Sequence, residues 1–167
     1  MPTDLDIADQ IVDTVAAWVD AEVVPNASQF ELADEFPEAM VEQMKAFGLF
    51  GCVIPEQYGG GGMGIRCAAA ILEEVAASGA CMNGASAVHM SIFGMHPVVE
   101  HGSEEMKQRF LPSVANGTLH VAFGVTEPVA GSETARIRTR AERVDDGWLI
   151  NGQKIWTSRA LYSDLMI

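Results

Sequence analysis

Apolar residues recur every three or four positions along the first two thirds of the chain, which is the spacing of one face of an α-helix. This pattern predicts five helices, over residues 4–24, 37–48, 65–77, 80–100 and 103–117. We expect the first helix to end at Pro25 and the last to be broken by Pro112, because proline lacks the N–H that a helix interior uses. Ser103 is the expected N-cap of the last helix.

The stretch 75–99 carries no formal charge and could be mistaken for a membrane span. It contains Asn83, Pro97, two histidines and several serines and glycines, whereas a spanning helix needs about 20 mostly large apolar residues. We therefore expect a helix that is buried on most sides inside a helical domain.

Beyond about residue 118 the hydrophobic period changes to two, which predicts β-strands. We expect strands over residues 120–126, a meander over 138–144, 148–150 and 153–157, and a further strand from residue 164. The dipeptides Asp146-Gly147 and Asn151-Gly152 are strong signals for the two turns of the meander. The predicted fold class is α+β, with an all-α helical domain (1–118) followed by a partial antiparallel β-domain (119–167).

The last three residues, Leu165, Met166 and Ile167, form an apolar run inside a predicted strand. Three or four strands alone would leave unpaired edges and an uncovered face. We therefore expect the chain to be the front part of a longer protein.

The composition is ordinary for a globular protein, with 49% hydrophobic and 20% charged residues. Asp and Glu number 23 against 10 Lys and Arg, which gives a formal net charge of −13, and most of the acidic excess lies in residues 1–60. A chain this acidic repels phosphate groups and anionic lipids, so we expect neither nucleic-acid nor membrane binding.

The acidic N-terminus resembles neither a signal peptide nor a transit peptide. The 3 cysteines form no CxxC pair, so they predict no disulfide framework and no zinc site, and they fit a reducing, cytoplasmic compartment. The glycine run 59–62 lacks a preceding strand and a following lysine, so we interpret it as a flexible turn. We interpret each of the 4 histidines as buried and hydrogen-bonded, namely His89, His96, His101 and His120.

The most informative segment is F-G-V-T-E-P-V-A-G-S (123–132), which is followed by Trp156, Thr157 and Ser158. The small residues at 130–132 leave backbone N–H groups and one hydroxyl available, an arrangement that can bind a pyrophosphate. An indole and two hydroxyls on a neighbouring strand suit a flat ring with polar edges. The alternative is a hairpin loop beside a core tryptophan.

This segment resembles the acyl-CoA dehydrogenase family, whose pattern here is close to T-E-P-G-A-G-S-D. Three further stretches resemble the family in the same order, V-I-P-E-Q-Y-G-G (53–60), K-Q-R-F-L-P-S-V-A-N-G (107–117) and N-G-Q-K-I-W-T-S (151–158). The chain departs from the pattern where Val129 replaces a glycine, Glu133 replaces an aspartate, and Ser158 stands where threonine is commoner. The resemblance implies an N-terminal helical domain, a central β-domain and a C-terminal four-helix domain.

The resemblance also implies an enzyme that binds FAD and removes an α-proton and a β-hydride from an acyl-CoA, leaving a trans-2-enoyl-CoA. The electrons would pass to an electron-transfer flavoprotein, and the complete protein would be a homo-oligomer, a dimer or tetramer. The residues that the resemblance assigns to FAD are Phe123, Val125, Thr126, Gly131, Ser132, Trp156, Thr157 and Ser158.

Among these residues, the resemblance places the first three at the flavin ring and Trp156 on the ring face away from substrate. Gly131 and Ser132 would lie at the pyrophosphate, and Ser132 would also approach the CoA arm. Ser158 would offer its hydroxyl near the reactive flavin nitrogen, where a hydrogen bond strengthens as hydride arrives.

The family's catalytic base is a carboxylate in the C-terminal helical domain, so the resemblance places the base beyond Ile167 and no catalytic residue is predicted within the chain. We interpret Glu127 as a structural residue of its turn. The helix over 81–99 would line the acyl pocket. Its small residues leave room for an acyl group or allow close helix packing; they are Gly84, Ala85, Ala87 and Gly94.

Two other functions remain open at this point. One is a flavin-dependent monooxygenase of the same fold, and the other is a non-catalytic helical interaction module. A catalytic carboxylate beyond Ile167 would favour the dehydrogenase over both.

Overall fold

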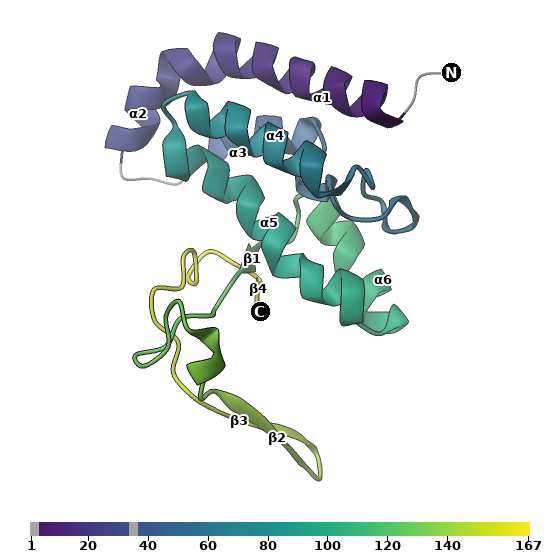
Figure 1. Ribbon diagram of the computed structural model, residues 1–167, viewed down its shortest axis with the longest axis vertical. Coiled ribbons are helices and arrows are strands. Elements are labelled where there is room, and N and C mark those ends of the chain that lie inside the picture. The colour runs from purple at the N-terminus through teal and green to yellow at the C-terminus, as the bar shows by residue number, and fades with distance from the viewer. Residues whose placement is uncertain (1–3, 34–36) are drawn as a thin grey trace.

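The computed structural model describes residues 4–33 and 37–167, with the helices gathered at one end and a β-hairpin projecting from the other (Figure 1). The α-helices are α1 (Asp4–Trp18), α2 (Ala27–Leu32), α3 (Glu38–Ala46), α4 (Gly64–Ala77), α5 (Cys81–His101) and α6 (Glu104–Ala115). The strands are β1 (Val121–Ala122), β2 (Arg140–Val144), β3 (Gly147–Asn151) and β4 (Leu165–Met166). The predicted α+β class is confirmed, because helices precede strands along the chain.

The predicted break at Pro112 is wrong, whereas the predicted end of the first helix at Pro25 is confirmed for its α- and π-helical part, although the chain does not leave the helical conformation there. The chain passes from α1 through a π-helical turn (Val19–Val23) and a 3₁₀ turn (Val24–Asn26) directly into α2. Pro25 lies in the first turn of the 3₁₀ segment, where its missing N–H is not needed. Helix α6 continues through Pro112, because the fully buried Leu111 and Val114 on either side hold its last turn in the core.

The predicted cap of α6 is confirmed. The backbone N–H of Met106 donates to the Ser103 hydroxyl oxygen at 3.2 Å. This bond satisfies one of the free N–H groups at the helix start. The acidic Glu104 and Glu105 lie in the first turn, where the helix dipole favours negative charge.

Helix α5 is the central element of the helical part and lies between the other helices and β1 (Figure 1). Its residues up to Ile92 contribute Val88 and Ile92 to a core shared with α1, α3 and α4, and its later residues contribute Met95 to a second core with α6. The predicted burial of this uncharged helix is therefore confirmed. Among the described residues, no helix combines the length and apolarity that crossing a bilayer requires.

The small residues of α5 serve close packing. A methyl group added at Gly94 would lie 2.6 Å from Cγ1 of Val121, and one added at Gly84 would lie 3.2 Å from Cγ1 of Val75. Ala85 and Ala87 are buried as well. Close packing against α4 at Gly84 and against β1 at Gly94 therefore accounts for the two glycines.

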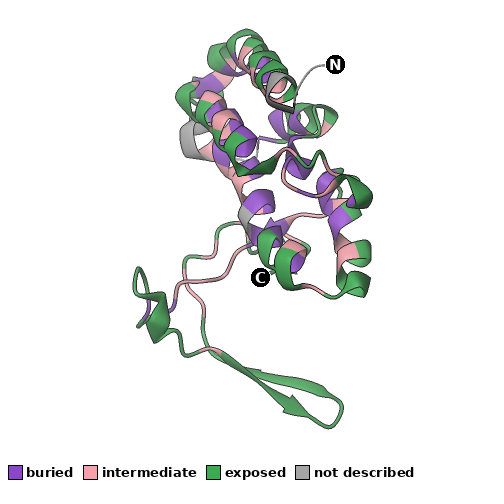
Figure 2. Cartoon of the chain, turned by 45° about the vertical axis from the view of Figure 1, so that its right-hand side comes forward, coloured by how far each residue is buried: buried purple, intermediate pink, exposed green. Residues whose placement is uncertain are grey.

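Strands β2 and β3 form an antiparallel hairpin with Val144 opposite Gly147, so the predicted hairpin is present and its turn lies one residue earlier than the Asp-Gly signal. Every residue of the two strands is exposed, in contrast to the buried interior of the helical part (Figure 2). The hairpin therefore adds no core of its own.

The predicted third strand over 153–157 is absent, and Asn151-Gly152 does not form a turn. The chain instead leaves the hairpin and runs beside residues 125–126, where the Ile155 N–H donates to the Thr126 carbonyl oxygen at 2.9 Å. The predicted strand over 120–126 shortens to β1, which pairs in parallel with β4, so this part of the β-structure is not antiparallel.

Candidate functional site

The structure brings together the two segments that the sequence predicts as a site. The Ile155 N–H donates to the Thr126 carbonyl oxygen at 2.9 Å, and the Lys154 ammonium donates to the Val125 carbonyl oxygen at 3.0 Å. The parallel β1–β4 pair holds the two segments at their other ends. One surface is therefore formed by two segments that are far apart in sequence, residues 123–126 and residues 154–158.

Glu127 links this surface to the chain that leads into β2. Its carboxylate accepts hydrogen bonds from the backbone N–H of Arg138 at 2.7 Å and of Thr139 at 2.9 Å, and from Lys154 Nζ at 3.0 Å. The Glu127 side chain is only 3% exposed. These contacts agree with the interpretation of Glu127 as a structural residue.

The nearby Thr139 side chain and the hydrogen bonds from the Arg138 and Thr139 backbone N–H groups and from Lys154 lower the pKa of Glu127 from 4.5 to about 2. Between pH 4.5 and pH 2 the native state therefore binds fewer protons than the unfolded state. The ionised Glu127 carboxylate stabilises the native state fully above pH 4.5, and this stabilisation is lost as the pH falls towards 2.

We expect the difference in melting temperature between the unmodified protein and Glu127→Gln to shrink as the pH falls from 4.5 towards 2. The exposed Glu142→Gln on β2 is the control, and an equal pH dependence for both variants would contradict the prediction.

Within residues 1–167, Trp156 is not part of a hydrophobic core. Its side chain is 86% exposed, and its backbone has a φ of +59°. A bulky residue rarely adopts this left-handed conformation, and such strain concentrates at sites that bind ligands. Thr157 is half-buried and Ser158 is exposed, so the tryptophan ring and the serine are both accessible.

The turn before β2 presents the predicted pyrophosphate residues to solvent. The Glu127 and Ala130 backbones exchange two hydrogen bonds, of 2.9 and 3.1 Å, around Pro128 and Val129. Gly131 and Ser132 follow and are exposed, and a methyl group added at Gly131 would meet no atom within 4 Å. The chain itself therefore does not require glycine at 131.

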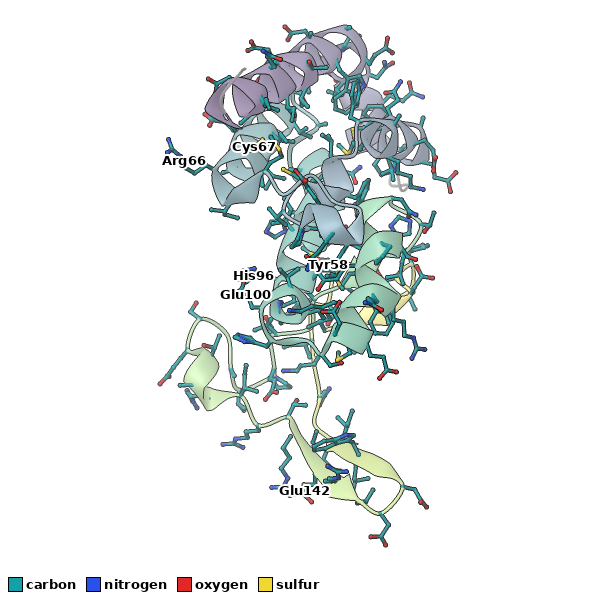
Figure 3. The ribbon with its side chains drawn as sticks, turned by 90° about the vertical axis from the view of Figure 1, so that its right-hand side faces the viewer. Tyr58, Arg66, Cys67, His96, Glu100 and Glu142 are labelled. Atoms are coloured by element: carbon teal, nitrogen blue, oxygen red, sulfur yellow. The ribbon has the colours of Figure 1, made fainter. Side chains whose placement is uncertain are left out.

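An apolar groove of about 620 Å³ runs along α5 beside Phe123. It is lined by Val53, Gly64, Ile65, Ile92, His96, Pro97, Val99, Glu100 and Phe123. His96 and Glu100 lie on the same side of α5, one turn apart (Figure 3). The resemblance already placed a pocket along residues 81–99, but the sequence did not indicate that Val53, Gly64 and Ile65 contribute to it.

The prediction that every histidine is buried is wrong for His96 and His101, which are exposed on the last turns of α5. His89 and His120 are half-buried, and burial lowers the pKa of both imidazoles. Across the part of the chain that the structure describes, no three His, Cys, Asp or Glu side chains converge to hold a metal ion.

Comparison with known protein families gives matches over almost the whole chain. Residues 6–118 match the acyl-CoA dehydrogenase N-terminal domain, and residues 122–167 match the acyl-CoA dehydrogenase middle domain. The chain belongs to the acyl-CoA dehydrogenase family.

Individual relatives agree with this assignment. The glutaryl-CoA dehydrogenase of Desulfococcus multivorans is 36% identical over 157 residues, which cover 92% of this chain and 40% of the relative. A solved glutaryl-CoA dehydrogenase–glutaryl-CoA complex has a TM-score of 0.85 at 32% identity, over 96% of this chain and 41% of that one. A glutaryl-CoA dehydrogenase from Mycobacterium smegmatis in complex with FADH2 has a TM-score of 0.80 at 29% identity, over 95% of this chain and 41% of that one.

The chain therefore spans about 40% of the length of the acyl-CoA dehydrogenases that it matches. Its departures from the family pattern fit the local backbone. Val129 has no positive φ, so the turn does not need the glycine that is usual there. Glu133 is exposed and its carboxylate lies 3.9 Å from the Arg136 guanidinium, so the longer acid causes no crowding.

Proposed function

We propose that the chain is the N-terminal portion of an FAD-dependent acyl-CoA dehydrogenase that converts an acyl-CoA thioester into a trans-2-enoyl-CoA. The observation that carries the proposal is the surface formed by Val125, Thr126 and the exposed, strained Trp156. A related dehydrogenase with the same fold was solved with FADH2, which supports the choice of cofactor. We place the boundary between helical domain and β-domain at residue 118.

The residues present fit FAD. The N–H groups of Gly131 and Ser132 donate to no other described backbone group, so they are available to a pyrophosphate. Trp156 offers an uncovered aromatic face, and Phe123, Val125 and Thr126 of the other segment are half-buried. This combination of an aromatic face and free polar edges suits an isoalloxazine ring and its diphosphate.

FAD, when bound, supplies the acceptor for the β-hydride of the substrate. In this proposal the chain's own residues bind and orient the cofactor. The Trp156 ring would cover one flavin face and exclude water from it, and the exposed Ser158 hydroxyl would donate a hydrogen bond at the ring edge. Ser132 would hold the pyrophosphate and approach the CoA arm.

The substrate and partners follow from the family in the same way. Helix α5 would line the acyl side of the site, and an electron-transfer flavoprotein would accept the electrons. The catalytic base would be a carboxylate outside residues 1–167, and the complete enzyme would be a homodimer or homotetramer.

Titration of the full-length apoprotein with FAD, followed by anaerobic addition of acyl-CoAs of several chain lengths, tests the proposal. We expect stoichiometric FAD binding and loss of the flavin absorption band on addition of a good substrate. FAD that stays oxidised with every acyl-CoA would contradict the dehydrogenase assignment, and reoxidation coupled to hydroxylation of an added aromatic would favour a monooxygenase.

Gly131→Ala separates binding from folding. Because a methyl group at this position meets no atom within 4 Å, we expect the melting temperature to change by less than about 2 °C. The same methyl group would stand where the pyrophosphate approaches the backbone, so we expect FAD affinity to fall about tenfold. Gly131→Ala protein that binds FAD as tightly as the unmodified protein would argue against a diphosphate at this turn.

A further inference from the structure

Few backbone contacts join the two segments expected at the cofactor. Between residues 125–127 and 153–157, the described backbone makes a single hydrogen bond, from Ile155 N–H to the Thr126 carbonyl oxygen. Neither segment is part of a strand at this point. One such bond adds little net stability, because water offers an equivalent partner in its absence. Apart from the β1–β4 pair farther along the chain, the backbone therefore fixes the register of this surface only weakly.

The Lys154 side chain crosses between the two segments. Its ammonium group donates to the Val125 carbonyl oxygen at 3.0 Å and to Oε1 of Glu127 at 3.0 Å. The side chain is only 20% exposed, so water competes weakly for these contacts. Lys154 therefore binds both the backbone and the side chain of the opposite segment.

Glu127 provides the opposite charge. Its buried carboxylate also accepts the N–H groups of Arg138 and Thr139, but Lys154 is the only cationic side chain among its described hydrogen-bond partners. A buried carboxylate that loses its only counter-charge is strongly disfavoured. Each member of the pair thus fixes the other's place.

We propose that Glu127 and Lys154 are positioning residues that set how far Trp156 and Ser158 lie from Val125 and Thr126, and thereby shape the surface that receives FAD. The pair acts through the backbone and does not itself touch the reacting atoms. The proposal rests on the proposed function for the identity of the ligand. We call the Glu127–Lys154 pair the clamp. Its positioning role can be tested without knowing the ligand.

The experiment uses the full-length protein and four variants. Lys154→Met keeps the aliphatic stem of the side chain and removes its charge. We expect this variant to raise the dissociation constant for FAD about tenfold or more and to shift the visible spectrum of bound flavin. Lys154→Arg restores the charge and should recover affinity to within about threefold. Glu127→Gln should change FAD affinity and the flavin spectrum in the same way as Lys154→Met. Lys45→Met is the matched control, because it breaks the Lys45–Glu42 pair on the surface of α3 and should change neither quantity.

A second measurement is independent of the ligand. Amide hydrogen exchange of the apoprotein should be faster over residues 153–158 in Lys154→Met, and unchanged there in Lys45→Met. Unchanged exchange, or unchanged FAD affinity and spectrum, would overturn the clamp. If the unmodified protein binds no FAD, the proposed function is wrong, and hydrogen exchange alone then decides the clamp.

Folding of the variants is checked by circular dichroism. If Lys154→Met does not fold, FAD affinity, the flavin spectrum and hydrogen exchange are measured on Glu127→Gln instead, since the amide keeps the volume of the carboxylate. If neither folds, the pair serves global stability and the proposal is overturned.

Discussion

Residues 1–167 by themselves are expected to oxidise acyl-CoA at a rate near background, even with FAD added. General-base catalysis contributes roughly 10²–10⁴-fold, and no base for the α-proton is identified in this part of the protein. Glu127 cannot take that role, because its carboxylate is 3% exposed, holds three hydrogen bonds and has a pKa of about 2. A group with so low a pKa is a poor proton acceptor.

Loss of positioning adds to the deficit. Well-oriented reactants gain up to roughly 7–11 kcal/mol over free encounter. The Trp156 surface and the groove beside Phe123 are both open to solvent in residues 1–167, so flavin and acyl chain would each be held on one side only. We therefore expect residues 1–167 to bind FAD weakly and to turn over acyl-CoA at a rate near background.

The assay is acyl-CoA oxidation with an artificial electron acceptor and added FAD, comparing residues 1–167 with the full-length protein. The mass and the helical content of the shorter chain are checked first. A comparable rate in the two proteins would contradict a base outside residues 1–167. Glu100 would then be the first residue to replace, because it lines the groove beside Phe123.

Replacement of Trp156 by alanine is expected to weaken FAD binding in the full-length protein roughly tenfold to a hundredfold. One face of an indole buries a large apolar area against a flavin, and aromatic contact adds about 0.5–1.5 kcal/mol beyond that burial. The side chain is 86% exposed in residues 1–167, so its removal takes nothing from their core. Flavin fluorescence during titration measures the affinity.

Trp148→Ala is the matched control for this prediction. Trp148 is also exposed, at 63%, but it lies on β3 in the projecting hairpin, away from the predicted cofactor segments. We expect Trp148→Ala to leave FAD affinity within about twofold of the unmodified protein. Equal losses of FAD affinity in the two variants would show that the effect is not specific to Trp156. Unchanged FAD affinity in both would show that Trp156 is not part of the FAD site.

Features that depend on residues close in sequence were predictable. The change of hydrophobic period near residue 118 located the transition from helices to strands, since period reflects which face of each element is buried. The Ser103 cap and the β2–β3 hairpin followed from residues within three or four positions of each other. The motif around Thr126 and Trp156 indicated the family that the comparisons confirm.

The error at Pro112 arose where distant contacts outweighed a local preference. Pro112 costs α6 one backbone hydrogen bond, but Leu111 and Val114 are buried in a core shared with α5, and that packing keeps the helix continuous. The absent third strand has the same kind of cause. Residues 153–157 alternate as a strand would, yet they bind residues 125–127 instead of β3.

Local sequence patterns were enough to predict the change from helices to strands, the Ser103 cap and the motif that marks the family, because each is set by neighbours within about one turn or one hairpin. Contacts between distant segments were needed to show that β1 pairs in parallel with β4, that Trp156 is exposed in residues 1–167, and that Lys154 binds Glu127. Each of these depends on where the chain returns after dozens of residues. The free energy that selects such a return is summed over the whole core, so no local pattern records it.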